Sequence, residues 1–238
     1  KNRREIVKLL ALAELSLYLP ACTSDERKKK RNSKKNKEKD PVSEIEEAIK
    51  SNNVTYLKKS DEPFDELNQG FNLAAGKVPA LIALCMNTQG VSEAIMFARK
   101  KGLKVAVKSG GHSFENFSSI DDGLQINLSL MNEVKWVDQT TVSIQPSCTP
   151  REMYDALLPN NRIIPTGSCG GVGVGGITLG GGYGFFARKY GLTCDAVKEI
   201  TFVDGTGEIH QVKRGEELMW ALKGGGNGNF GVVSEFTF

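Results

Sequence analysis

The stretch that decides the fold is Thr166-Gly-Ser-Cys-Gly-Gly-Val-Gly-Val-Gly-Gly-Ile-Thr-Leu-Gly-Gly-Gly-Tyr-Gly184. So dense a run of glycine has little side-chain surface to bury, and it loses much backbone freedom when the chain folds. We expect glycine here because the backbone must come very close to another group. Several glycine N–H groups can point at one anion, so the segment predicts the site of a long, phosphate-containing cofactor.

Two further glycine-rich loops lie on either side of this run. Upstream is Val107-Lys-Ser-Gly-Gly-His-Ser113, and downstream is Lys223-Gly-Gly-Gly-Asn-Gly-Asn-Phe-Gly-Val-Val233. The upstream loop carries His112 and the central run carries Cys169, each with glycine neighbours that leave the backbone open. Three such loops predict a cofactor that the protein wraps and to which a His and a Cys can be bonded.

The dinucleotide pattern G-x-G-x-x-G occurs twice, at Gly171/Gly173/Gly176 and at Gly226/Gly228/Gly231. Its mechanism needs a helix that begins at the loop and points its N-terminus at the pyrophosphate. We expect no stable helix after the first match, where Ile-Thr-Leu-Gly-Gly-Gly follows, and a strand after the second. The sequence therefore argues against a Rossmann domain, and it holds no Walker motif.

Hydrophobic periodicity predicts a mixed α+β fold with more strand than helix in the second half. The apolar residues of 53–79 follow neither the helical period nor the strand period. Helices are expected at 89–101, which Gly102 ends, and at 149–158 and 216–222, with a capping box at Ser43–Glu46 opening a further short helix. Strands are expected at 80–86, 104–108, 123–128, 135–145, 162–164, 195–203, 207–212 and 232–238, with a hairpin turned at Asp204-Gly205.

Charge is unevenly placed along the 238 residues, whose formal net charge is +3. Arg27–Arg31 and Lys34–Lys39 supply much of the excess, and the remainder is slightly acidic. That remainder argues against a nucleic-acid-binding globular face. We interpret residues 23–52 as a basic, largely disordered spacer. The five cysteines include no C-x-x-C pair, so no metal site is expected.

The first 22 residues resemble a bacterial lipoprotein signal, with basic Lys1–Arg4, a mostly apolar run over Ile6–Ala21, and Cys22 after small residues. This interpretation implies export and membrane anchoring through lipidated Cys22, in the periplasm or at a membrane. The alternative is an ordinary amphipathic helix in a cytoplasmic protein, because Lys8 and Glu14 interrupt the apolar run. No run is long and apolar enough to predict a permanent transmembrane helix.

Five ordered motifs together resemble the PCMH-type FAD-binding domain of the vanillyl-alcohol oxidase/p-cresol methylhydroxylase superfamily, and within it the berberine-bridge-enzyme-like oxidases. The motifs are Lys108–Ser113, Pro165–Cys169 with Val172–Gly176, Leu179–Gly184, Tyr190–Thr193, and Trp220–Gly226 with Asn229–Val233. The resemblance implies two α+β subdomains with FAD between them, over residues 73–238.

In that family the His of the Gly-Gly-His-Ser loop bonds to the 8α-methyl group of the flavin, and a Cys at the place of Cys169 bonds to its 6-position. The resemblance therefore implies covalent, bicovalent FAD held by His112 and Cys169. It also implies a set of residues around the cofactor. The cofactor-binding residues expected are Ser109, Gly110, Gly111, His112, Ser113, Gly167, Ser168, Cys169, Val172, Gly173, Gly175, Gly176, Thr178, Gly182, Tyr183, Gly231 and Val233.

The resemblance further implies an FAD-dependent oxidoreductase that moves hydride from an alcohol or sugar-like carbon of a small molecule to flavin, with O2 as the final acceptor. Its catalytic base would lie in a substrate domain after residue 238, so we expect that domain to be absent and these residues to be inactive alone. Two alternatives stay open. One is a catalytically inactive, FAD-fold lipoprotein binding module, and the other is a noncovalent FAD/NADPH reductase of the same superfamily.

Overall fold

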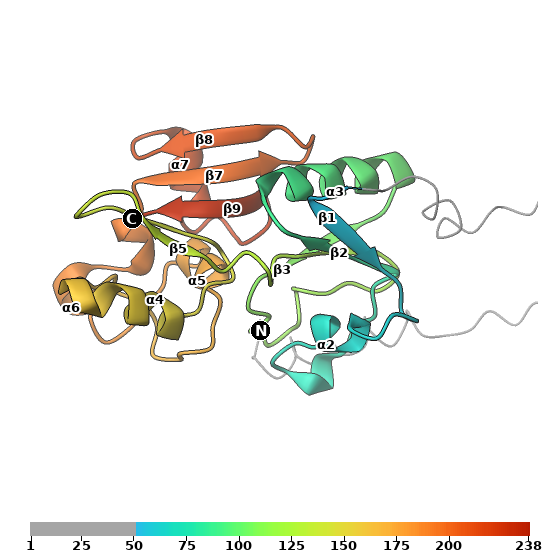
Figure 1. The fold of residues 1–238 in the computed structure, drawn as a ribbon, viewed down its shortest axis with the longest axis horizontal. Coiled ribbons are helices and arrows are strands. Elements are labelled where there is room, and N and C mark those ends of the chain that lie inside the picture. Colours follow the sequence, from blue (N-terminus) through green and yellow to red (C-terminus); the bar gives the residue numbers. More distant parts are fainter. Residues whose placement is uncertain (1–50) are drawn as a thin grey trace, which may run out of the picture. The chain divides into compact units, whose positions relative to one another are not determined.

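The computed structural model describes residues 51–238 (Figure 1). The predicted signal at 1–22, nearly all of the predicted spacer at 23–52 and the capping box at Ser43–Glu46 lie outside these residues, so they stay predictions. Within the described part, no helix combines the length and the apolar character that a membrane crossing requires.

The first sheet contains four strands in the order β1-β2-β4-β3. These are β1 (Val54–Leu57), β2 (Leu81–Cys85), β3 (Val105–Lys108) and β4 (Leu124–Asn127). Strands β2 and β3 both pair parallel with β4, while β1 pairs antiparallel with β2. Strand β2 is a continuous apolar run, as expected for a strand covered on both faces. Strand β4 instead alternates apolar Leu124 and Ile126 with Gln125 and Asn127, and all four residues are buried.

Strand β1 belongs to a region that sequence reasoning left unassigned. It lies upstream of the predicted domain start at residue 73, so the first sheet begins before that boundary. Two short helices follow β1, namely α2 (Phe64–Asn68) and the 3-10 helix η1 (Leu73–Ala75). Both are too short to leave a periodic pattern.

Helix α3 (Thr88–Lys101) confirms the predicted helix, and it links the two sheets. Asn87 caps its first turn by accepting a hydrogen bond from Gly90 N, and Gly102 ends it with φ 66°. The helix packs against β1 and β2, and it also contacts β7 and β9 of the second sheet (Figure 1). Its Thr88 hydroxyl donates to Ser234 Oγ of β9 over 2.9 Å.

The second sheet contains five antiparallel strands in the order β5-β6-β9-β7-β8. These are β5 (Val134–Trp136), β6 (Val142–Ile144), β7 (Glu199–Asp204), β8 (Ile209–Lys213) and β9 (Gly231–Thr237). The single strand predicted at 135–145 is wrong, because Asp138 accepts a hydrogen bond from Thr140 N and turns the chain between β5 and β6.

Helices and irregular segments carry the chain between the strands of the second sheet. They are α4 (Pro150–Leu157), η2 (Leu158–Asn160), α5 (Val174–Leu179), α6 (Ala187–Tyr190), η3 (Thr193–Ala196) and α7 (Glu217–Leu222). Thr149 and Glu152 form a capping box at the start of α4. The strand predicted at 162–164 does not form, and β7 begins four residues later than predicted because η3 occupies 193–196.

A buried cluster from the second sheet, α4, α5 and α7 forms one core. Among its fully buried members are Ile144, Met153, Val174, Val197 and Phe236. The side chain of Val174 therefore anchors α5 in this core, and the glycine run that contains α5 is fixed to the sheet beneath it. The chain from β6 to α5 is held in the same way, since Cys148 is also a fully buried member.

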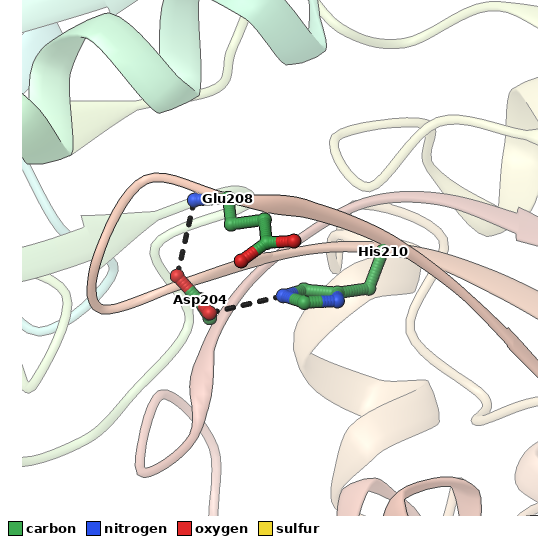
Figure 2. Close-up of side chains that lie close together, drawn as sticks. All are labelled: Asp204, Glu208 and His210. Carbon is green, nitrogen blue, oxygen red and sulfur yellow. Dashed lines mark hydrogen bonds and ion pairs between the residues drawn. The ribbon is translucent and has the colours of Figure 1, made fainter.

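The β7–β8 hairpin closes on Asp204, as Figure 2 shows. One carboxylate oxygen of Asp204 accepts hydrogen bonds from Thr206 N at 2.7 Å and Glu208 N at 3.1 Å, and the other lies 2.9 Å from His210 Nε2. The Thr206 hydroxyl also donates to Asp204 over 2.6 Å, and this bond first, with that to His210 next, holds the pKa of Asp204 well below its usual range. Both oxygens have partners within the hairpin, so the turn accounts for the Asp204, Glu208 and His210 cluster.

Candidate functional site

Two glycine loops touch each other backbone to backbone. The chain leaves β3 directly into the 109–113 loop, and the segment before α5 lies against it. A Cβ atom placed on Gly110 would lie 2.2 Å from Gly173 N, and one on Gly173 would lie 2.5 Å from Gly110 N. Real Cβ contacts are never so short. The two loops can meet this closely only because both positions are glycine, as the sequence predicts for a close backbone approach.

The contact between the loops brings His112 near the segment that carries Cys169. A Cβ atom on Gly171, two residues after the cysteine, would have His112 Nε2 as its nearest neighbour at 3.8 Å. The Cys169 side chain is exposed and its sulfur is free, while the His112 imidazole is half-buried. The ring of Phe71 stacks on this imidazole, with 4.7 Å between ring centroids and 18° between planes.

Backbone donors gather where the loops meet. Within residues 51–238, no acceptor takes a hydrogen bond from the N–H groups of Gly110, Gly111 or His112, nor from those of Gly170 and Gly171. Gly111 adopts the left-handed conformation with φ 69°, which glycine takes without a Cβ clash. Such a concentration of free donors is suited to an anion such as a diphosphate.

A helix forms where sequence reasoning expected none. Helix α5 begins after Gly173 and contains Gly175 and Gly176. Its first turn is held from outside, because Val174 N donates to Cys148 O at 2.8 Å and Gly175 N donates to Pro146 O at 2.7 Å. These tertiary contacts override the poor helix propensity. The reason given against a Rossmann domain at the first glycine match is therefore wrong, but the conclusion stands on another ground, because the residues before α5 form no strand.

Two buried hydroxyl groups in the glycine run lack partners. Thr166 Oγ1 and Thr178 Oγ1 make no hydrogen bond to any of the described residues, and the two side chains are only 3 % and 1 % exposed. Leaving a buried hydroxyl unpaired costs about 1–3 kcal/mol. A polar group of a bound molecule would remove that cost at each site, so both atoms are candidate ligand contacts.

The third glycine loop reaches the second through Asn227. Its side-chain amide donates to Gly176 O over 2.9 Å, at the N-terminal half of α5. Asn229 holds the loop itself, because its amide donates to Gly225 O over 3.0 Å. The described part of the chain therefore connects all three loops that the sequence singled out. Sequence reasoning did not identify Asn227, whose only signal was its place between glycines.

Basic side chains lie next to the 109–113 loop and to the 166–184 glycine run. The Lys108 ammonium is buried directly before the 109–113 loop and donates to Leu67 O over 2.6 Å. Burial lowers the pKa of Lys108. Arg151 in the first turn of α4 borders Gly170, where its backbone N donates to Gly170 O over 3.4 Å. The surroundings of the loops are therefore suited to a negatively charged ligand.

Some predicted cofactor contacts have a role in protein packing. A Cβ on Gly182 would lie 2.0 Å from Thr193 Oγ1, and one on Gly231 would lie 2.3 Å from Val203 O. Val233 is buried in the core and pairs with Phe202 in the β7–β9 ladder. For these three residues the protein itself explains the residue type. Their contact with a cofactor stays a prediction.

The remaining predicted residues divide by exposure. Ser109, Ser113, Gly167, Val172 and Gly176 are half-buried, Gly175 is buried against Pro146, and Ser168 and Tyr183 are exposed. Ser113 Oγ also accepts a hydrogen bond from Phe117 N at 3.1 Å, which fixes the exit of its loop. Of these, Val172 and Ser109 lie at the contact of the two loops, since a Cβ on Gly110 would lie 3.2 Å from Val172 C and one on Gly173 would lie 2.8 Å from Ser109 Oγ.

Residues 79–213 match the family described as the FAD binding domain, which is more than half of the chain. The chain belongs to the FAD binding domain family. The matched residues include the whole 109–113 loop, the central glycine run and β7, so the FAD-binding domain contains both His112 and Cys169.

Several relatives resemble this FAD-binding domain. Glucooligosaccharide oxidase of Sarocladium strictum is 35% identical over 202 residues, which are 82% of this chain and 40% of that protein. Berberine bridge enzyme-like 12 of Arabidopsis thaliana is 36% identical over 71% of this chain and 33% of its own length. The chain spans less than half the length of these curated relatives.

Solved structures of similar fold confirm the predicted fold class. The 6-hydroxy-D-nicotine oxidase of Arthrobacter nicotinovorans superposes with TM-score 0.73 and 29% identity over 77% of this chain and 41% of that chain. A glucooligosaccharide oxidase of Acremonium strictum, described as containing 6-S-cysteinyl, 8α-N1-histidyl FAD, has TM-score 0.73 and 35% identity over 78% and 40%. The predicted α+β, PCMH-type FAD-binding fold is thus confirmed.

The residues present fit FAD on the evidence of this structure. The free N–H groups of the two touching loops can donate hydrogen bonds to a diphosphate, and the buried hydroxyls of Thr166 and Thr178 can bond to further polar groups. His112 and Cys169 offer the two nucleophiles. Sequence reasoning missed Phe71, which lies in the region without periodicity and shows its role only through its contact with His112.

Proposed function

We propose that this chain is the FAD-binding part of an FAD-linked oxidase that takes hydride from an alcohol or sugar-like carbon of a small molecule, with O2 as electron acceptor. The observation that carries the proposal is the contact of Gly110 with Gly173, which brings the His112 loop against the segment after Cys169. Family membership and the similarity to oligosaccharide oxidases support it.

Each loop has a separate task in this proposal. The N–H groups of Gly110, Gly111 and His112 bind the diphosphate, and Lys108 adds a positive charge beside them. The threonine hydroxyls at 166 and 178 bind polar groups deeper in the site. Bound FAD supplies the capacity to accept two electrons as hydride.

We further propose that His112 and Cys169 both form covalent bonds to the flavin. The similarity to an oxidase described with 6-S-cysteinyl, 8α-N1-histidyl FAD supports this chemistry, as does the free, exposed thiol of Cys169. Each bond replaces one hydrogen on the side chain and one on the flavin carbon. The two hydrogens and two electrons released for each bond would be taken up by O2, which would be reduced to hydrogen peroxide.

Intact-protein mass after expression with FAD and acid denaturation tests the proposal. The expected result is a gain of one FAD that survives acid in the wild-type chain and in the His112→Ala and Cys169→Ala single variants. The double variant is expected to lose it. FAD that binds but is released by acid from the wild type would refute covalent attachment and favour the noncovalent reductase. No bound FAD at all would refute the cofactor role and favour an inactive binding module.

We also propose that residues 1–22 are a lipoprotein signal and that Cys22 carries the lipid. A lipid on Cys22 would attach this FAD-binding domain to a membrane facing the periplasm, with residues 23–52 as a charged spacer. Detergent-phase partition of the chain expressed in a bacterium, compared with a Cys22→Ser variant, tests this. Equal partition of the two would refute the lipid anchor and favour a cytoplasmic location.

A further inference from the structure

One aromatic ring stacks on the His112 imidazole. A functional imidazole is usually oriented by a hydrogen bond from its second nitrogen. Here neither ring nitrogen of His112 has a hydrogen-bond partner among residues 51–238. Its preceding residues, Gly110 and Gly111, have no side chains to confine it. The contact that remains is the stacked ring of Phe71, 4.7 Å away and nearly parallel at 18°.

Phe71 is itself held in register with the His112 loop. Its backbone N donates to Gly111 O over 2.9 Å, and the next residue, Asn72, donates its side-chain amide to Phe114 O over 2.6 Å. The ring of Phe114 packs edge-on to Phe71, with 5.9 Å between centroids. These contacts fix the segment at both ends of the loop that carries His112.

Packing of the core does not explain the position of this aromatic ring. Phe71 is 57% exposed, so burial of its own surface contributes little to stability. What the ring does cover is one face of the imidazole, while Nε2 is directed toward Gly171. Phe71 therefore covers a face of the His112 ring and not its Nε2 edge, which lies near the segment that follows Cys169.

We propose that Phe71 is a positioning residue that holds the His112 imidazole in the orientation needed for bonding to flavin. The inference rests on the proposed function, because it concerns the same site. An offset aromatic pair of this kind restricts the ring enough to change the rate of attachment by about two- to tenfold. Phe71→Leu is expected to slow covalent attachment by that factor, and Phe71→Tyr is expected to keep the wild-type rate.

The test combines a ring signal with an attachment rate in the 238-residue chain. The sequence contains only two histidines, so an isotope-labelled His spectrum shows His112 and His210, and a His210→Gln variant assigns them. Without FAD, Phe71→Leu should displace the His112 ring signals while Phe71→Tyr does not. Acid-stable FAD is then measured against time after FAD is added to the cofactor-free chain.

Phe117→Leu is the matched control, because this 72% exposed aromatic ring follows the His112 loop in the chain and contacts Lys77 instead of His112. The inference predicts slower attachment for Phe71→Leu alone, with Tm and reversible FAD affinity equal to those of the control. Unmoved His112 signals, or equal attachment rates for Phe71→Leu and wild type, would overturn it. A wild-type chain that never acquires acid-stable FAD would instead refute the covalent proposal, and the positioning role with it.

Discussion

Replacing Gly110 by alanine tests whether the contact between the two glycine loops builds the site. The new Cβ would lie 2.2 Å from Gly173 N, 2.8 Å from Gly173 Cα and 3.2 Å from Val172 C. All three are backbone atoms, so no side chain can rotate away. Gly110 is not among the residues with positive φ, so the substitution adds no backbone strain of its own. The whole effect must come from forcing the loops apart.

The size of the displacement follows from the contact distances. Ordinary Cβ contacts begin at 3.4 Å, so the loops must separate by about 1 Å at this point. Overpacking of this kind costs about 1–3 kcal/mol, which lowers Tm by roughly 2–12 °C for a domain of this size. A misplacement of about 1 Å at reacting groups can slow a reaction about a hundredfold. We therefore expect a modest loss of stability and a large loss of covalent FAD attachment.

The assay measures acid-stable FAD by mass against time, together with thermal unfolding by circular dichroism. Gly76→Ala is the control, because a Cβ there meets nothing within 4 Å and its φ is −62°. The reciprocal variant Gly173→Ala should reproduce the defect, since its Cβ would lie 2.5 Å from Gly110 N. Attachment by Gly110→Ala at the rate of the control would refute the role of the loop contact.

Two further predictions concern buried groups. Thr178→Val should weaken FAD binding about two- to tenfold. It should not destabilise the cofactor-free chain, because the Thr178 hydroxyl has no partner in the described protein. Titration of each variant with FAD measures this, with the exposed Thr55→Val substitution as the control. Equal affinities would exclude the contact. Burial raises the pKa of Cys85 to about 12, so its stabilisation is complete below pH 9 and declines by about 1.4 kcal/mol per pH unit as pH rises toward 12. Urea unfolding from pH 8 to 11 should show a shallower decline for Cys85→Ala, and parallel curves would contradict this.

The parts of the fold that the sequence predicts are those with strong local signals. Helix α3 combines a 3.6-residue apolar period with an end at Gly102, and both features formed as expected. Strand β2 is a short apolar run buried on both faces, so its pattern needs no partner to be visible. Strand β1 has no such signal. Its place is set by pairing of Val54 with Cys85, a contact between residues far apart in the sequence.

Within the site, the sequence predicts which loops matter better than it predicts what each glycine does. Gly110 and Gly173 are glycine because two loops meet, whereas Gly182 and Gly231 are glycine because Thr193 and a strand backbone lie against them. All four look alike in the sequence, since the missing Cβ does not say which neighbour requires its absence.

The same limit explains why α5 was missed and why its correction leaves the cofactor prediction intact. Propensity argues against a helix through Gly175 and Gly176, but bonds from Pro146 and Cys148 set its first turn from another part of the chain. Because those bonds use the N–H groups of Val174 and Gly175, the donors left free are the ones just upstream, in the segment after Cys169. The N–H groups of Val174 and Gly175 are therefore not available to an anion, whereas those of the touching loops are. It follows that a variant that weakens α5 alone should affect FAD binding less than one that separates the loops.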